Sequence, residues 1–441
     1  MKKVFVVCAV AGWMLRASLA IEIPLTYVRH EEERRDGGFQ PAGYGGVAMK
    51  FKPPEGEWKL PELIGPRPLY GLALLGNEFR LFVLSRQKQE DVFYNRMYFD
   101  ANGNKDLTDD PFVDGAINHR QEHDFCVVSF PPVDMTIPQD GSDTPFSFAA
   151  TMSVSRFSQF EKRQDEEAGQ RLWIMLRSYC HYEGAFELNG QKYRVALNDA
   201  SADGRFDKAM TYRKAPQGDG EAEGLFGAER TDLFYLSRGD RLSIHEWHQL
   251  GNHLVLDGTV FHVKVDIPGR VITLTEKTDG LAALKLGEET EQLTLLDREE
   301  GNCVMAHRAG DRVMLPQGSY RLLAYRVLKE DKWGDRWIMR GEGDGRSQFV
   351  EAKGGQENTL PLGQPLRVVV TAYTYRGGAS YRLNFELKGD GGESIGEVVH
   401  ISGSLTEIPL STSRRNYPKE ATYQVVRMDG EVVARGTFEY G

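Results

Sequence analysis

The chain has 441 residues, of which 40% are hydrophobic and 27% are charged, and its formal net charge at pH 7 is −10. This length suffices for several domains with well-filled cores, and the composition excludes a disordered chain and a collagen-like one. An acidic surface of this size argues against nucleic acid and anionic lipid as partners, and it is compatible with cation binding.

The N-terminus has the three regions of a secretory signal peptide. Lys2 and Lys3 supply the positive charge, an apolar run covers 4–15, and Ala20 ends a small-residue segment after which cleavage is expected. Residues 1–20 therefore predict export, as a secreted, periplasmic or cell-envelope protein. The apolar run is too short to cross a bilayer, and no other segment approaches the roughly 20 apolar residues needed, so we expect no membrane span.

Short alternating runs and 47 glycines indicate an all-β protein. Three two-residue turns that contain glycine, Gly76-Asn77, Asn189-Gly190 and Asp257-Gly258, each lie between strand-like runs and predict β-hairpins. The most helix-like stretch, 161–171, is charged throughout without an apolar stripe. We therefore interpret it as a polar connection between two strands.

Short oxygen-bearing side chains recur at every second position after the expected strand Met97-Tyr98-Phe99. Side chains at alternate positions of a curled loop converge on one point, and such oxygens are the ligands that a hard cation needs. We call residues 100–110 loop one. Its predicted ligands are Asp100, Asn102, Asn104, the main-chain carbonyl of Asp106, and a closing carboxylate from Asp109 or Asp110.

A second segment repeats this spacing directly after the outgoing strand of the hairpin at Asn189-Gly190. Gly204 stands at the position where a calcium loop makes its sharp turn. We call residues 199–207 loop two. Its predicted ligands are Asp199, Ser201, Asp203, the main-chain carbonyl of Arg205, and Asp207.

Both loops resemble the EF-hand-like and dockerin-like calcium loops of secreted bacterial β-proteins, over about a dozen residues each. The resemblance implies Ca²⁺ as a structural cofactor. Lys105 stands where the family has glycine, and the twelfth positions are Pro111 and Met210 instead of a bidentate acid. Neither flank predicts a helix, which favours a structural staple over a sensor that opens on binding.

Two histidine-containing segments are alternative metal sites. His119-Arg120-Gln121-Glu122-His123 matches the H-x-x-E-H of inverzincin proteases, which requires a helix. The expected strand Phe125–Phe130 leaves room for at most two helical turns, so a solvated loop is favoured. His245-Glu246-Trp247-His248 is a near match to H-E-x-x-H, with His253 close by, and surface or packing histidines are the favoured interpretation there.

Three cysteines remain beyond the leader, Cys126, Cys180 and Cys303. An odd number with wide spacing matches neither a disulfide framework nor a zinc ribbon. A Cys126–Cys180 bridge is one alternative in an oxidising compartment, and free buried thiols are the favoured one.

The strand pattern changes near Gly280. We expect residues 21–279 to form an N-terminal β-sheet or barrel-like domain that carries both loops. Residues 280–360 are expected to form a β-sandwich and residues 361–441 an immunoglobulin-like β-sandwich, on strand spacing alone. The turn Pro316-Gln317-Gly318-Ser319-Tyr320-Arg321-Leu322 resembles the P-x-G-x-Y-x-L corner of small extracellular β-sandwiches.

The sequence therefore predicts an exported, calcium-stabilised, multi-domain β-protein with a structural, attachment or ligand-binding role. Its expected partner is an envelope protein or a polysaccharide. The sequence contains no G-x-S-x-G, catalytic-cysteine or phosphate-loop motif, so no catalytic residue is assigned and a non-enzyme is favoured. The alternative is a secreted hydrolase acting on polysaccharide or cell-wall material with accessory β-sandwiches. A metalloprotease at His119 and His123 is a third.

Overall fold

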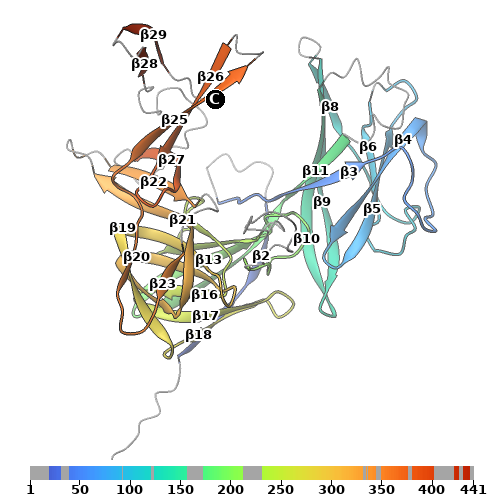
Figure 1. The fold of residues 1–441 in the computed structure, drawn as a ribbon. Coiled ribbons are helices and arrows are strands. Elements are labelled where there is room, and N and C mark those ends of the chain that lie inside the picture. The colour runs from blue at the N-terminus through green and yellow to red at the C-terminus, as the bar shows by residue number, and fades with distance from the viewer. Residues whose placement is uncertain are drawn as a thin grey trace, which may run out of the picture.

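The computed structural model describes residues 19–30, 39–91, 93–120, 124–155, 172–211, 231–330, 334, 336–343, 349–375, 380–401, 422–426 and 431–437. Within these ranges the chain forms β-strands and no helix, so the all-β prediction is confirmed. Figure 1 shows most strands in two groups, one on the right and one on the left of the view.

Two antiparallel sheets make up the right-hand group (Figure 1). One sheet, in spatial order, consists of β3 (Tyr44–Met49), β11 (Leu172–Ser178), β10 (Ser142–Ser155), β9 (Phe125–Gln139) and β8 (Ala116–Arg120). The other consists of β4 (Ile64–Leu75), β5 (Glu78–Arg86), β6 (Arg96–Phe99) and β7 (Phe112–Asp114). The rings of Phe82, Phe99 and Phe148 pack together with centroids 5.8 to 6.1 Å apart. This aromatic contact joins the two sheets through a common core.

A third sheet carries loop two. In spatial order it consists of β15 (Trp247–Gln249), β14 (Leu233–Arg238), β13 (Gln191–Asn198), β12 (Cys180–Leu188) and β2 (Thr26–Arg29). β13 ends at Asn198, so the first residue of loop two, Asp199, follows a strand end as predicted.

The other strands form a 13-stranded sheet and a separate two-stranded sheet. In spatial order the longer sheet contains β1 (Ala20–Pro24), β18 (Val271–Glu276), β17 (Thr259–Asp266), β16 (His253–Leu256), β20 (Cys303–Pro316), β19 (Leu281–Asp297), β21 (Gly318–Glu330), β22 (Arg336–Glu342), β27 (Ser394–Ile401), β26 (Ser380–Lys388) and β25 (Arg367–Tyr375). β23 (Val350–Ala352) pairs with β21, β24 (Asn358–Leu360) pairs with β19, and β28 (Thr422–Val426) pairs with β29 (Val432–Thr437). The expected boundary at residue 280 lies between β18 and β19, within one sheet.

β16 lies between two hydrophobic cores. Leu254 and Leu256 belong to a core that runs in sequence from Ile23 to Met305, whereas Val255 belongs to a second core that ends at Leu362. Successive side chains of a strand point to opposite faces, so this short buried strand contributes to both cores. Its parallel pairing with β20 crosses the expected domain boundary.

All three predicted hairpins are present, as β4–β5, β12–β13 and β16–β17. Asn189 and Gly190 have φ angles of 51° and 74°, and the φ of Gly76 is 63°. Such left-handed residues give the turn a twist that matches the twist of the flanking strands. The turn residues therefore explain why these strands pair where they do.

Tyr320 bonds across the turn between β20 and β21. The Tyr320 hydroxyl donates a hydrogen bond of 2.8 Å to the carbonyl of Pro316, and the ring is fully buried. The strand-like runs 284–286 and 292–296 of the sequence both belong to β19, whose pairing with β20 is irregular between Lys285 and Gln292. The immunoglobulin-like arrangement of strands stays a prediction.

The cysteines are free and buried, as the favoured interpretation predicted. Burial raises the pKa of Cys126 to about 11 and that of Cys303 to about 12, so these thiols stay protonated at neutral pH. Residues 1–18 of the predicted leader lie outside the described ranges, and Ala20 begins β1, where it pairs with Thr275. Across the part of the chain that the structure describes, no helix is long and apolar enough to cross a membrane.

Candidate metal-binding loops

Strand pairing fixes the first residue of loop one. The amide of Asp100, directly after β6, donates to the carbonyl of Leu81 on β5 at 3.0 Å, and the side chain is only 1% exposed. Its Oδ1 accepts a hydrogen bond of 2.8 Å from the amide of Gly103. Its Oδ2 is buried without any hydrogen-bond partner. Loop one thus begins with a buried carboxylate that has one oxygen unused.

The amide side chains of loop one hold the turn. Asn102 Oδ1 accepts from the amide of Asn104 at 2.9 Å, and Asn104 Oδ1 accepts from the amide of Asp106 at 2.7 Å. Asn104 Nδ2 donates to Asp109 at 2.9 Å. The carboxylate of Asp106 turns to Lys59 instead, and this hydrogen bond lowers the pKa of Asp106 to about 2. Asp106 is therefore left with its carbonyl as the predicted ligand.

Asp110 supplies the second unused carboxylate oxygen. Its Oδ2 is buried and has no hydrogen-bond partner. Burial, with smaller contributions from the charges of Asp100 and Asp109, raises the pKa of Asp110 to about 6, whereas hydrogen bonds from the amides of Ala101 and Asn102 oppose the shift. The side chain of Asp110 therefore lies beside the first residues of loop one, where its negative charge adds to that of Asp100.

A buried arginine lies under loop one. Arg80 pairs with Glu78 at 2.9 Å, and its Nε and Nη1 have no hydrogen-bond partner. Gly103 has a φ of +81°, which favours glycine, and a Cβ there would lie 1.9 Å from Arg80 Nη1, so another residue would push the guanidinium aside. The guanidinium offsets part of the negative charge of loop one, yet Asp100 Oδ2 keeps no hydrogen bond.

Loop two has the same backbone pattern as loop one. The fourth and sixth positions have positive φ in both: Gly103 and Lys105 in loop one, Ala202 and Gly204 in loop two. The seventh amide donates to the fifth side chain in both, at 2.7 Å in loop one and 3.1 Å in loop two. Leu107 and Phe206, at the eighth positions, are both buried. The repeated spacing therefore corresponds to a repeated local structure.

Asp199 is fully buried at the start of loop two. Its Oδ1 accepts from the amide of Ser201 at 3.0 Å and its Oδ2 from the amide of Gly204 at 2.6 Å. Asp203 accepts a hydrogen bond from Lys208 Nζ, and Asp207 faces the guanidinium of Arg205 at 3.1 Å. The structure thus brings Asp199, Ser201 and Asp203 together, whereas Asp207 is held in an ion pair.

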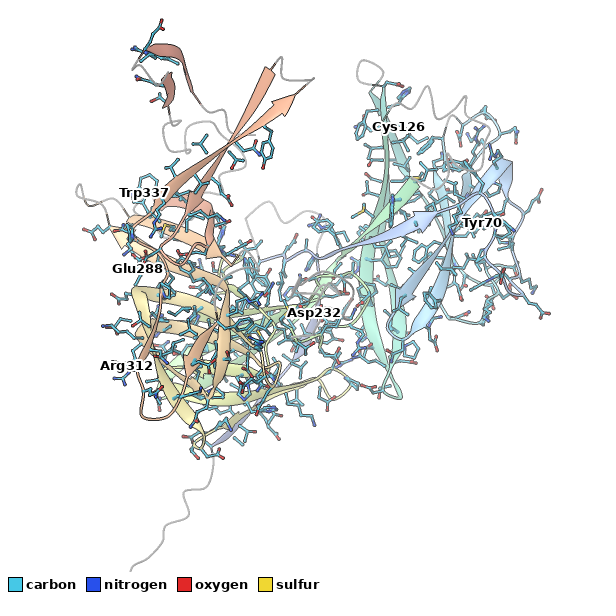
Figure 2. All side chains as sticks on the ribbon, viewed as in Figure 1. Tyr70, Cys126, Asp232, Glu288, Arg312 and Trp337 are labelled. Atoms are coloured by element: carbon cyan, nitrogen blue, oxygen red, sulfur yellow. The ribbon has the colours of Figure 1, made fainter. Side chains whose placement is uncertain are left out.

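Asp232 is a residue of this site that the sequence analysis missed. It lies far from loop two in sequence, fully buried, and accepts hydrogen bonds from the amides of Ala200 at 3.1 Å and Lys208 at 2.8 Å. Burial and the charges of Asp199 and Asp203 raise the pKa of Asp232 well above its ordinary value. In Figure 2 Asp232 lies where the right-hand and left-hand sheets meet. In the sequence, the one feature that marks Asp232 is its position directly ahead of the strand-like run 233–236. That position does not indicate that Asp232 contacts loop two.

Among the described residues, no three histidine, cysteine or acidic side chains converge closely enough to hold a metal ion on their own. Calcium also takes amide and main-chain oxygens, and both loops supply these beside their carboxylates. The donor set of loop one fits a hard cation because two of its carboxylate oxygens are buried without partners. In loop two the amides and Lys208 already satisfy the carboxylates, so a cation would have to displace Lys208.

The histidine segments take other roles. His119 lies on strand β8 and is exposed, and 121–123 fall outside the described residues. His248 Nδ1 lies 3.2 Å from Thr294 Oγ1 and its ring faces His307, whereas the ring of His253 packs against His262. Burial lowers the pKa of His307 to about 3 and that of His253 to about 4, so both rings are neutral at physiological pH. Apart from the exposed His119 and His262, these histidines pack within the fold.

Comparisons of this chain with protein-family models, with curated proteins and with solved structures found no match. The functional argument therefore depends on the residues and geometry of the loops alone.

Proposed function

We propose that this chain is an exported β-protein that two calcium loops stabilise, with a structural, attachment or ligand-binding role. The observation that carries the proposal is the pair of unused oxygens in loop one, Asp100 Oδ2 and Asp110 Oδ2. A buried carboxylate oxygen without a partner costs stability, because it has lost its water and gained nothing in return. A divalent cation that prefers oxygen ligands removes that cost.

Loop two supports the proposal through its place in the fold. The carbonyl of Ala200 accepts from the amide of Tyr44 at 3.0 Å, and the carbonyl of Asp203 accepts from the amide of Gly76 at 2.6 Å. Loop two therefore contacts β3, the β4–β5 turn and, through Asp232, the residues ahead of β14. A calcium ion in loop two would stabilise the junction of three sheets.

The predicted compartment agrees with the donor set. The signal-peptide pattern of residues 1–20 predicts a location where calcium is abundant. Extracellular calcium modules bind with dissociation constants of roughly 10⁻⁴ to 10⁻³ M, which loops without a bidentate twelfth ligand can reach. The resemblance to calcium loops, the expected export and the unused oxygens all favour the same ion.

The test is calcium binding to the exported form of the chain. Equilibrium dialysis should give two calcium ions per chain, and a chelator should lower the melting temperature. A melting temperature that is the same in calcium and in chelator would overturn the proposal. Screening polysaccharides and peptidoglycan for turnover tests the role separately, because activity abolished by changing one acid outside both loops would establish the hydrolase alternative.

A further inference from the structure

β3 and β4 are the edge strands of the two right-hand sheets, and they meet at one place. Lys50 and Tyr70 exchange two backbone hydrogen bonds, of 2.8 and 2.7 Å, and form the isolated bridge between the sheets. Figure 2 labels Tyr70 on the right-hand group. Both strands are fully described, and no ladder joins them beyond this bridge.

Loop two separates the two strands at the other end. Tyr44, the first residue of β3, is bonded to Ala200, and Gly76, directly after β4, is bonded to Asp203. Between the bridge and loop two the surface has a cavity of about 540 Å³. We call it the β3–β4 groove. Its main lining residues are Tyr44, Gly46, Leu72, Leu74, Trp173 and Met175.

The groove is apolar and uncharged. Large apolar side chains with substantial exposure line it: Trp173 is 49% exposed, Leu74 47%, Tyr44 46%, Leu72 38% and Met175 36%. The one acidic or basic side chain in the lining is Asp203, and Lys208 neutralises it. Exposed apolar patches of this kind mark sites where another molecule binds.

Main-chain groups on both sides of the groove face inward. The N–H and C=O groups of successive residues in a strand point alternately to its two sides. Because Tyr44 and Lys50 bond away from β11, Gly46 and Ala48 point the same way, toward β4. By the same alternation Leu72 and Leu74, which lie between Tyr70 and Gly76, point toward β3.

Two glycines allow close approaches along the groove. A Cβ at Gly71 would lie 2.9 Å from the carbonyl of Ala48, so the strands approach closely there. A Cβ at Gly46 would lie 3.2 Å from the indole of Trp173. The indole of Trp173 therefore packs beside the backbone of Gly46, which is itself exposed.

We propose that the β3–β4 groove binds an extended, uncharged peptide segment rich in large apolar side chains. Its backbone pairs with the inward-facing groups of Gly46, Leu72 and Leu74, as in the recognition of peptides by sheet edges. Its apolar side chains cover Trp173 and Met175. A charged segment is excluded because the groove has no free ionic partner for it, and a sugar is disfavoured because the lining offers few side-chain groups to hold its hydroxyls. The groups that would bind the peptide, on Gly46, Leu72, Leu74 and Trp173, are not calcium ligands, so failure of calcium binding would leave this inference standing.

The test uses the full chain in calcium-containing buffer and a random heptapeptide library displayed on phage. Peptides enriched on the chain should alternate large apolar residues with small or polar ones, and Leu74→Asp should weaken their binding at least tenfold in fluorescence polarisation. Trp173→Ala should weaken it similarly. Ile244→Asp is the matched control, because Ile244 is 48% exposed and lies outside the groove, and it should bind like the unchanged chain.

Hydrogen exchange supplies a second measurement that does not depend on the variants. A bound peptide should slow exchange of the amides of Gly46, Leu72 and Leu74 in the unchanged chain. Enriched peptides that bind Leu74→Asp equally well, or that leave these amides unprotected, would overturn the proposal. Binding of glycans but not peptides on an array would overturn it in favour of a sugar, and a dimer that Leu74→Asp dissociates would replace the peptide with a second copy of the chain.

Discussion

The sharpest prediction concerns Asp100→Asn, whose effect on stability should change sign with calcium. Asparagine keeps the Oδ1 acceptor for the amide of Gly103. It removes the negative charge of the carboxylate, whose Oδ2 has no hydrogen bond. Relieving a buried charge that lacks a hydrogen bond is worth about 1 to 3 kcal/mol. We take the lower end because Arg80 already offsets part of the charge and because the new Nδ2 group has no acceptor there. In chelator the variant should therefore be about 1 kcal/mol more stable than the unchanged chain.

In calcium the same substitution removes a ligand. A bound ion stabilises the native state by about 2.7 kcal/mol when its concentration is a hundredfold above the dissociation constant. The variant loses the stabilisation by calcium but keeps the stabilisation of about 1 kcal/mol from removing the charge. In calcium it should therefore be about 2 kcal/mol less stable than the unchanged chain. The assay is urea unfolding of both proteins in calcium and in chelator.

Asp143→Asn provides the matched control for this experiment. It is the same Asp-to-Asn substitution, at an exposed residue of β10 away from both loops. It should change the free energy of unfolding by less than about 0.5 kcal/mol in either buffer. A destabilisation by Asp100→Asn of equal size in both buffers would refute the reasoning, since Asp100 would then act only through Gly103.

Three further predictions follow from other residues. Asp203→Ala should reduce bound calcium from two ions to one per chain in equilibrium dialysis, and retention of both ions would exclude Asp203 as a ligand. Burial lowers the pKa of His307 to about 3, so between about pH 6.5 and pH 3 the unfolded chain holds a proton on this ring that the folded chain does not. As the pH falls through that range, His307 by itself lowers the stability by about 1.4 kcal/mol per pH unit. His307→Leu should remove one proton from the uptake on unfolding at pH 5, measured by urea unfolding across pH, and an unchanged slope would contradict a neutral buried ring. Tyr320→Phe should cost about 1 to 2 kcal/mol because the carbonyl of Pro316 loses its donor, whereas Tyr373→Phe, at an exposed tyrosine, should have little effect.

Local chemistry was readable from the sequence. The hairpin at Asn189-Gly190 could be predicted because these residues tolerate positive φ, and their φ angles of 51° and 74° in the structure confirm it. The spacing of loop two likewise predicted a curled segment after a strand, and Gly204 makes the left-handed turn at the expected position. These features depend on neighbouring residues only.

The relation between distant segments was not readable in the same way. Asp232 joins loop two only because β14 pairs with β13, and the chain between 212 and 230 gives no indication of that pairing. The length of β19, which takes in both runs 284–286 and 292–296, depends on its partners β20 and β21. Register between strands is decided by which faces become buried, and burial exists only after the chain has folded.

The sequence by itself determined the all-β class, the hairpin turns and the curled form of the two loops, because turn preferences and strand alternation act over a few residues. Only the tertiary structure decided that Asp100 and Asp110 each leave an oxygen buried without a partner, and that β3 and β4 diverge into a groove at loop two. The reason is that burial and the pairing of strand edges come from segments far apart in the chain, and no short stretch of sequence contains both partners.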